Sequence, residues 1–97
     1  MKAVLVAIGD PFLLEVCLRY LATLGHIGLV VPRPLAILSM VQKVKCGACI
    51  VDSSELGRAA LVVCRGGLAG RMLLIAFGLS DEPGIVAIPL PSVLTVR

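Results

Sequence analysis

Five mostly apolar runs constrain the fold of this chain more than any other feature of its sequence. They are rich in Val, Ile and Leu, and each indicates a strand. The first and third runs, which are apolar without interruption after Lys2, indicate strands buried on both faces. The runs occupy residues 2–8, 27–31, 48–51, 71–77 and 85–88. Stretches with helical character separate the first four runs, which predicts parallel βαβ units with right-handed crossovers.

Helix signals fill each of the first three intervals. Asp10 before a proline combines an N-cap residue with a proline at the first helical position, and this helix runs to about residue 24. A second helix is predicted over residues 33–43. A third, capped by Ser53 or Ser54, is predicted over residues 55–65. The sequence therefore predicts an α/β three-layer sandwich around a mostly parallel central sheet.

The interval before the last run breaks this pattern. Only the turn-rich residues 78–84 separate the fourth and fifth strands, whereas a parallel return needs a crossover of about a dozen residues. We therefore expect the fifth strand either to run antiparallel to the fourth or to be reached in another subunit.

Composition limits the classes of function that remain. The 97 residues predict one domain over 1–97. Charged residues interrupt every candidate membrane span, no signal peptide is recognised, and a net charge of +3 with 3% aromatic residues gives little support for nucleic-acid binding. We expect a cytoplasmic protein without a membrane or nucleic-acid partner.

The chain is unusually apolar for a soluble monomer. Hydrophobic residues make up 59% of it, with a mean hydropathy of +1.06. This surplus has to enter a buried sheet, an oligomer interface, or both. We therefore predict a homodimer, in which residues 85–97 form the oligomerisation segment.

The four cysteines suit a structural role better than a chemical one. Cys46 and Cys49 form a CxxC spacing, but the redox version of this motif lies at a helix N-terminus, which lowers a thiol pKa. Here the motif leads into a strand, so we expect Cys49 to pack as a small hydrophobe. Cys17, Cys64 and the single histidine complete no metal-ligand pattern. No metal or cofactor is predicted.

Asp52 is the best candidate for a functional residue. It ends the apolar run 48–51 and is followed by two serines. The carboxyl ends of parallel strands are where open α/β sheets place their functional groups.

The order of these elements, with Asp52 ending the third strand, resembles the receiver domain of two-component response regulators, which has a flavodoxin-like fold. The resemblance covers about residues 2–77, with the fourth and fifth helices reduced or missing. It is carried by the strand and turn 4–11, the helix and turn 12–26, the strand 48–52, and Leu90-Pro91, which looks like the Lys-Pro after the fifth strand.

Matched residue by residue, the resemblance makes Asp52 the equivalent of the phosphoacceptor but leaves its pocket incomplete. The metal-binding acid pair falls on Ile8 and Gly9, with Asp10 at the next position, and Ala76 stands for the switch Ser or Thr. Leu90 stands for the lysine. Phosphoryl transfer needs cations at the transferring oxygens, and carboxylates usually hold Mg²⁺.

We therefore predict that Asp52 is not a competent phosphoacceptor and that it serves instead as the N-cap of helix 55–65. The predicted function is a degenerate receiver-like, non-enzymatic regulatory module that acts by phosphorylation-independent protein–protein interaction. The alternatives are a minimal response regulator phosphorylated on Asp52 and a small-ligand-binding α/β domain that uses the carboxyl edge near Gly9, Asp52 and Gly78.

Overall fold

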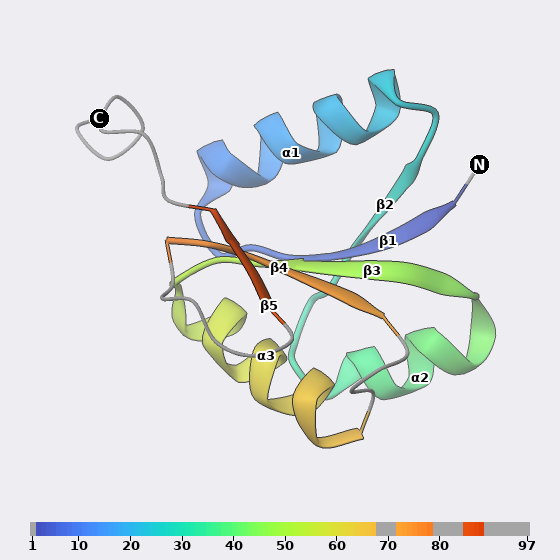
Figure 1. Ribbon diagram of the computed structural model, residues 1–97, viewed down its shortest axis with the longest axis vertical. Helices are drawn as coiled ribbons and strands as arrows, with labels where there is room; N and C mark the ends of the chain where they lie inside the picture. The colour runs from blue at the N-terminus through green and yellow to red at the C-terminus, as the bar shows by residue number, and fades with distance from the viewer. Residues whose placement is uncertain (1, 68–71, 79–84, 89–97) are drawn as a thin grey trace.

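A computed structural model describes residues 2–67, 72–78 and 85–88 (Figure 1). Five strands form a single sheet in the order β2-β1-β3-β4-β5, and every neighbouring pair is parallel. The strands are β1 (Ala3–Ala7), β2 (Ile27–Val30), β3 (Cys46–Val51), β4 (Leu73–Phe77) and β5 (Ile85–Ile88).

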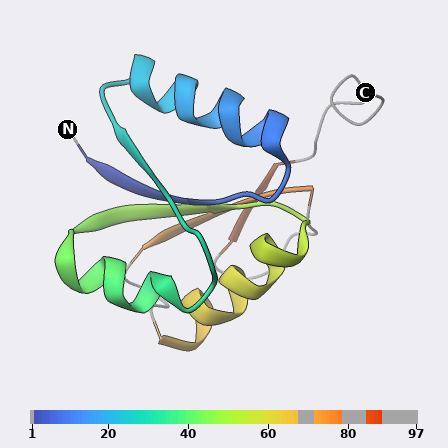
Figure 2. The ribbon, with the colours of Figure 1, turned by 180° about the vertical axis from the view of Figure 1, so that it is seen from behind.

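Three helices cover the two faces of this sheet. They are α1 (Pro11–Thr23), α2 (Ala36–Lys43) and α3 (Glu55–Gly67). Helix α1 lies on one side, and α2 and α3 lie on the other, as Figures 1 and 2 show from opposite directions. The predicted three-layer α/β fold is confirmed. None of the helices in the described ranges is long and apolar enough to cross a membrane.

Two apolar layers hold the sheet between the helices. On the α1 side, alternate residues of β1 and β3 pack with α1: Val4, Val6, Ile8, Leu13, Cys17, Leu21 and Ile50. On the other side, the intervening residues pack with α2 and α3: Leu5, Ala7, Val31, Ile37, Cys49, Val51, Ala60, Cys64, Leu74 and Ala76. Because β1 and β3 are covered on both faces, their sequences are apolar throughout.

Local chemistry sets the helix ends. The Asp10 side chain accepts hydrogen bonds from the backbone amides of Phe12 (2.9 Å) and Leu13 (3.2 Å), so the predicted N-cap is confirmed. Helix α2 begins three residues later than predicted, at Ala36. The amide of Ala36 bonds to the carbonyl of Arg33, three residues back, so a tighter turn of the 3₁₀ type precedes the α-helix.

A bulge in β3 changes which face the CxxC cysteines share. Ala3 pairs with Cys46 and Val4 pairs with Ala48, so Gly47 is an extra residue in the ladder. Cys46 therefore packs, half-buried, against the same apolar layer as the fully buried Cys49. Pairing also starts β3 two residues earlier than predicted.

Cys49 behaves as a small hydrophobe, as predicted. A hydrogen bond with the thiol of Cys64 on α3, together with burial, raises the pKa of Cys49 above its ordinary value. A buried thiol that resists ionisation is chemically inert. Across the described ranges, no three Cys, His, Asp or Glu side chains gather in a group able to hold a metal ion.

The expectation that β5 runs antiparallel to β4 is wrong. The two strands are parallel, with Leu74 beside Ile85 and Phe77 beside Ile88. The register explains why a short connection is enough. The chain returns along only three residues of β4, about 10 Å, whereas seven residues extend to as much as about 25 Å. Crossovers between parallel strands usually reach a dozen residues or more because most of them contain an α-helix.

Candidate functional site

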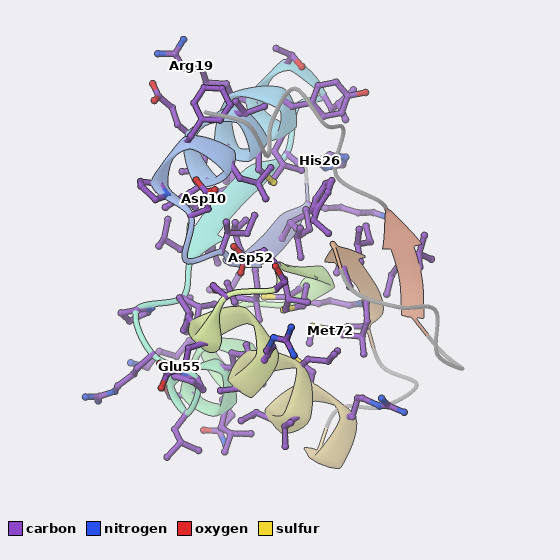
Figure 3. All side chains as sticks on the ribbon, turned by 90° about the vertical axis from the view of Figure 1, so that its left-hand side faces the viewer. Asp10, Arg19, His26, Asp52, Glu55 and Met72 are labelled. Atoms are coloured by element: carbon purple, nitrogen blue, oxygen red, sulfur yellow. The ribbon has the colours of Figure 1, made fainter. Side chains whose placement is uncertain are left out.

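The predicted functional edge of the sheet carries an open pocket of about 440 Å³. It lies where β1 and β3 end and α1 and α3 begin, and its lining comes from both turns: Gly9, Asp10, Pro11, Leu13, Asp52, Ser53 and Ser54. Asp10 and Asp52 lie close together at this edge (Figure 3).

Asp52 is the centre of this site. It is buried, with 3% of its surface exposed, and its carboxylate accepts four hydrogen bonds from protein donors. Oδ1 accepts from the Gly9 amide (3.3 Å), from the Ser54 amide (3.1 Å) and from the Ser54 hydroxyl, while Oδ2 accepts from the Asp10 amide (3.2 Å). Each oxygen of a carboxylate offers about two lone-pair sites, so Oδ1 is fully occupied by protein donors, whereas Oδ2 accepts one of them.

These bonds join segments that are far apart in the sequence. The amides of Gly9 and Asp10 belong to the β1–α1 turn, 43 and 42 residues from Asp52. The Ser54 hydroxyl also accepts a hydrogen bond from the Gly9 amide (3.1 Å). Asp52 and Ser54 therefore hold the β1–α1 turn against the β3–α3 turn.

Ser54, and not Asp52, caps helix α3. The Ser54 hydroxyl accepts from the Gly57 amide (3.0 Å), and its carbonyl accepts from the Arg58 amide (2.9 Å), which is the first bond of the helix. This is the geometry of an N-cap. The prediction that Asp52 caps the helix is wrong, because Asp52 lies two residues too early and its oxygens face the amides of the β1–α1 turn.

Two glycines make room for this arrangement. A Cβ on Gly57 would lie 2.2 Å from the backbone oxygen of Asp52 and 2.5 Å from its Oδ1. A Cβ on Gly9 would lie 2.5 Å from the Ser54 hydroxyl oxygen. Contacts this short do not occur in folded proteins, so both positions need glycine. The sequence interpretation missed the role of Gly57, whose signal is a glycine in the first turn of a helix directly after the acidic strand end.

Backbone and helix dipoles, and not a basic side chain, surround the Asp52 carboxylate in the described part of the chain. The only ion pair in the described part of the chain, Glu15 with Arg19, lies on the exposed surface of α1, so no basic side chain among these residues pairs with Asp52. The N-termini of α1 and α3 converge on its carboxylate instead. The positive ends of helix dipoles stabilise an anion, and Asp52 is itself the anion that these two N-termini surround.

The other residues suggested by the receiver resemblance lie apart from the pocket lining. Ile8 is buried beneath α1. Ala76, which pairs with Val51, is buried in the layer on the α2 and α3 side. Leu90 lies outside the described residues. Of the predicted residues, Gly9, Asp10 and Asp52 come together, and Gly78, at the end of β4, is not among the residues that line the pocket.

Asp10 caps helix α1 and also contacts Asp52. Its Oδ1 accepts from two amides at the start of α1, while its own amide donates to Asp52. One oxygen of the second carboxylate in the pocket is therefore engaged by the start of α1.

Comparison with known proteins supports the fold. No protein-family model matches the sequence, and no curated protein matches it. Among solved structures, the chain is similar to the crystal structure of the N-terminal domain of a response regulator receiver protein from Methanoculleus marisnigri JR1, with a TM-score of 0.69 and 14% sequence identity. The match covers 98% of this chain and 89% of that one. The receiver-type, flavodoxin-like fold inferred from the sequence is therefore confirmed.

Proposed function

We propose that this chain is a receiver-type regulatory module that acts through protein–protein contact and without phosphorylation of Asp52. The observation that carries the proposal is the set of four protein donors on the Asp52 carboxylate. A carboxylate in this state joins two turns of the fold. It is not held ready for a ligand.

The site lacks groups that a phosphoacceptor aspartate requires. Attack on a phosphoryl group needs a carboxylate oxygen with a free lone pair, and Oδ1 of Asp52 already accepts three hydrogen bonds. The reaction also needs a cation near the transferring oxygens. Ile8 and Gly9 carry no carboxylate for Mg²⁺, and Oδ1 of Asp10 is already engaged by the amides at the start of α1.

One observation favours the alternative of a minimal response regulator phosphorylated on Asp52. The pocket is open, two aspartates line it, and Oδ2 accepts only the Asp10 amide among the described donors. In that alternative, Oδ2 is the attacking atom and Asp10 is the second metal ligand. The two functions differ in one product, an acyl phosphate on Asp52.

We expect no acyl phosphate after the 97-residue chain is incubated with acetyl phosphate and Mg²⁺. The physical reason is the saturated Oδ1 together with the absence of an acid pair at Ile8 and Gly9. Intact-mass spectrometry at neutral pH reads the result directly, since each phosphoryl group adds a fixed mass. An active receiver domain treated in parallel controls for reagent quality.

A gain of one phosphoryl group that disappears in Asp52→Asn would establish the alternative and refute the proposal. A gain that persists in Asp52→Asn would place the modification elsewhere and leave the proposed role of Asp52 intact.

A further inference from the structure

The edge of the sheet at which the parallel strands begin, opposite the Asp52 pocket, is basic. Lys2 directly precedes β1 and Lys45 directly precedes β3, and both side chains are exposed. The acidic residues of the described ranges lie at the other edge of the sheet or in the first half of α1: Asp10, Glu15, Asp52 and Glu55. Within the described chain, positive and negative side chains are therefore separated along the strand direction.

The register of the sheet makes Lys2 and Lys45 neighbours. Ala3 of β1 pairs with Cys46 of β3, so the residues one position earlier in each strand lie side by side. Successive residues of a strand point to opposite faces of the sheet. Because Cys46 packs in the apolar layer on the α2 and α3 side, Lys2 and Lys45 both project on the α1 side.

Gly47 leaves space for the Lys2 side chain. A Cβ on Gly47 would come 3.9 Å from the Cδ atom of Lys2, so the aliphatic stem of Lys2 lies against the bulge in β3. The backbone of Lys2 is held from the other side, because its carbonyl accepts a hydrogen bond from the Ile27 amide (2.9 Å) on β2. The stem therefore leads the Lys2 ammonium group toward the strand that carries Lys45.

Two cations placed side by side in this way repel each other. Like charges at facing positions of adjacent strands destabilise a sheet, and the one ion pair within the described ranges, Glu15 with Arg19, lies on α1. An anion between the two ammonium groups would offset the repulsion. We propose that Lys2 and Lys45 form a clamp for a carboxylate group on an acidic segment of a partner protein. The inference names the chemistry of the partner in the protein–protein contact proposed above, and it rests on that proposal.

The small number of cations favours a protein carboxylate over a polyanion. Proteins that bind duplex DNA contact about six to ten phosphates, and basic segments that bind anionic membranes use about four to eight Lys or Arg. Besides Lys2 and Lys45, the described chain offers Lys43, which ends α2 two residues before Lys45. This set is too small for either polyanion, whereas two ammonium groups suit the two oxygens of one carboxylate.

An exposed apolar residue beside the clamp also suits a peptide segment. Leu73 begins β4 and is 52% exposed. It pairs with Ala48, which packs in the α1-side layer, so Leu73 lies on the same side of the sheet as the two lysines. An apolar side chain next to the bound carboxylate would cover Leu73, which a free carboxylate ion cannot do.

The clamp is remote from Asp52. Lys45 and Asp52 flank the two ends of β3, so they are about 20 Å apart, more than twice the distance over which salt screens a charge, about 8 Å. A partner bound at this edge therefore needs no change in the charge of Asp52, which fits regulation without phosphorylation.

Nuclear magnetic resonance titration of the ¹⁵N-labelled 97-residue chain with hexaglutamate at low ionic strength tests the clamp. We expect the largest amide shifts at Lys2, Lys45 and Gly47, and no shift at Gly9. Lys2→Glu and Lys45→Glu should each weaken binding at least tenfold. Arg33→Glu is the matched control, because it changes the net charge equally at an exposed residue beyond the carboxyl end of β2, and it should weaken binding less than threefold.

Thermal unfolding tests the juxtaposition of the two lysines without any ligand. Lys45→Glu should raise the Tm, because it places an opposite charge beside Lys2 where a like charge stood. A Tm that falls in Lys45→Glu contradicts the arrangement.

Three results of the titration would overturn the clamp: no binding of hexaglutamate, shifts centred away from Lys2 and Lys45, or equal losses in Lys45→Glu and Arg33→Glu. Tighter binding to a short DNA duplex, or to vesicles of phosphatidylserine and phosphatidylcholine, that is lost in Lys45→Glu would overturn the assignment of an acidic protein as partner. Asp52→Asn should bind hexaglutamate as the wild type does. An acyl phosphate on Asp52 refutes the proposed function whatever this titration shows, so the two proposals fail separately.

Discussion

Replacing Gly57 by alanine is expected to lower the free energy of unfolding by about 2–4 kcal/mol. Alanine favours a helix over glycine by about 1 kcal/mol, but its Cβ would lie 2.2 Å from the Asp52 carbonyl oxygen and 2.6 Å from the Asp52 amide nitrogen. These are backbone atoms, so the strand end itself has to move, and overpacking of this kind costs about 1–3 kcal/mol before any hydrogen bonds of Asp52 are lost. Chemical denaturation measures the change.

Gly66 provides the matched control in the same helix. A Cβ on Gly66 meets no atom within 4 Å, so Gly66→Ala should leave stability unchanged or raise it by less than about 1 kcal/mol. If Gly57→Ala proves as stable as Gly66→Ala, the close packing of Asp52 against α3 is not a feature of the folded protein.

Replacing Asp52 by alanine is expected to cost about 3 kcal/mol or more. The amides of Asp10 and Ser54 and the Ser54 hydroxyl would lose their acceptor, and the Gly9 amide would keep only the Ser54 hydroxyl oxygen. A buried donor left without a partner costs about 1–3 kcal/mol. Water entering the open pocket offsets part of this cost. Asp52→Asn should fall between wild type and alanine, because it keeps one acceptor oxygen but turns an NH₂ group toward donors.

The sign of the Asp52→Asn effect separates two kinds of site. Where acidic groups crowd together, removing one charge relieves repulsion and stabilises the fold; where donors surround a carboxylate, removing it destabilises. Glu15→Ala removes a carboxylate of an exposed pair and should change stability by less than about 1 kcal/mol. An Asp52→Asn variant more stable than wild type would contradict the anchoring role.

The fold was largely predictable because its signals are local. Apolar runs without polar alternation identified the strands, and Asp10 before a proline identified the start of α1 to the residue. The direction of β5 was not predictable from connection length alone, because the register determines how far the chain must return. The bulge at Gly47 was also not predictable from the residues of β3, because it depends on how β3 pairs with β1.

The location of the site was predictable from the sequence, but the hydrogen-bond partners of Asp52 were not. The rule that functional groups gather at the carboxyl ends of parallel strands located Asp52 correctly. Its partners could not be found the same way, because the Gly9 and Asp10 amides are backbone groups more than forty residues distant. The exposed apolar side chains of α1, which include Val16, Tyr20 and Leu24, were predictable, because a helix with a single narrow polar stripe has more apolar surface than one sheet covers.

Amide hydrogen exchange at Gly9 and Asp10 tests the central claim, that Asp52 anchors the β1–α1 turn, most directly. We expect both amides to be protected in the wild-type chain. In Asp52→Ala, their exchange should quicken at least tenfold relative to the amide of Val31, which bonds to the Val6 carbonyl (2.9 Å) and reports opening of the sheet. Gly9 and Asp10 amides that exchange at unfolded-chain rates in the wild type, or whose exchange relative to Val31 is unchanged in the variant, would contradict the account.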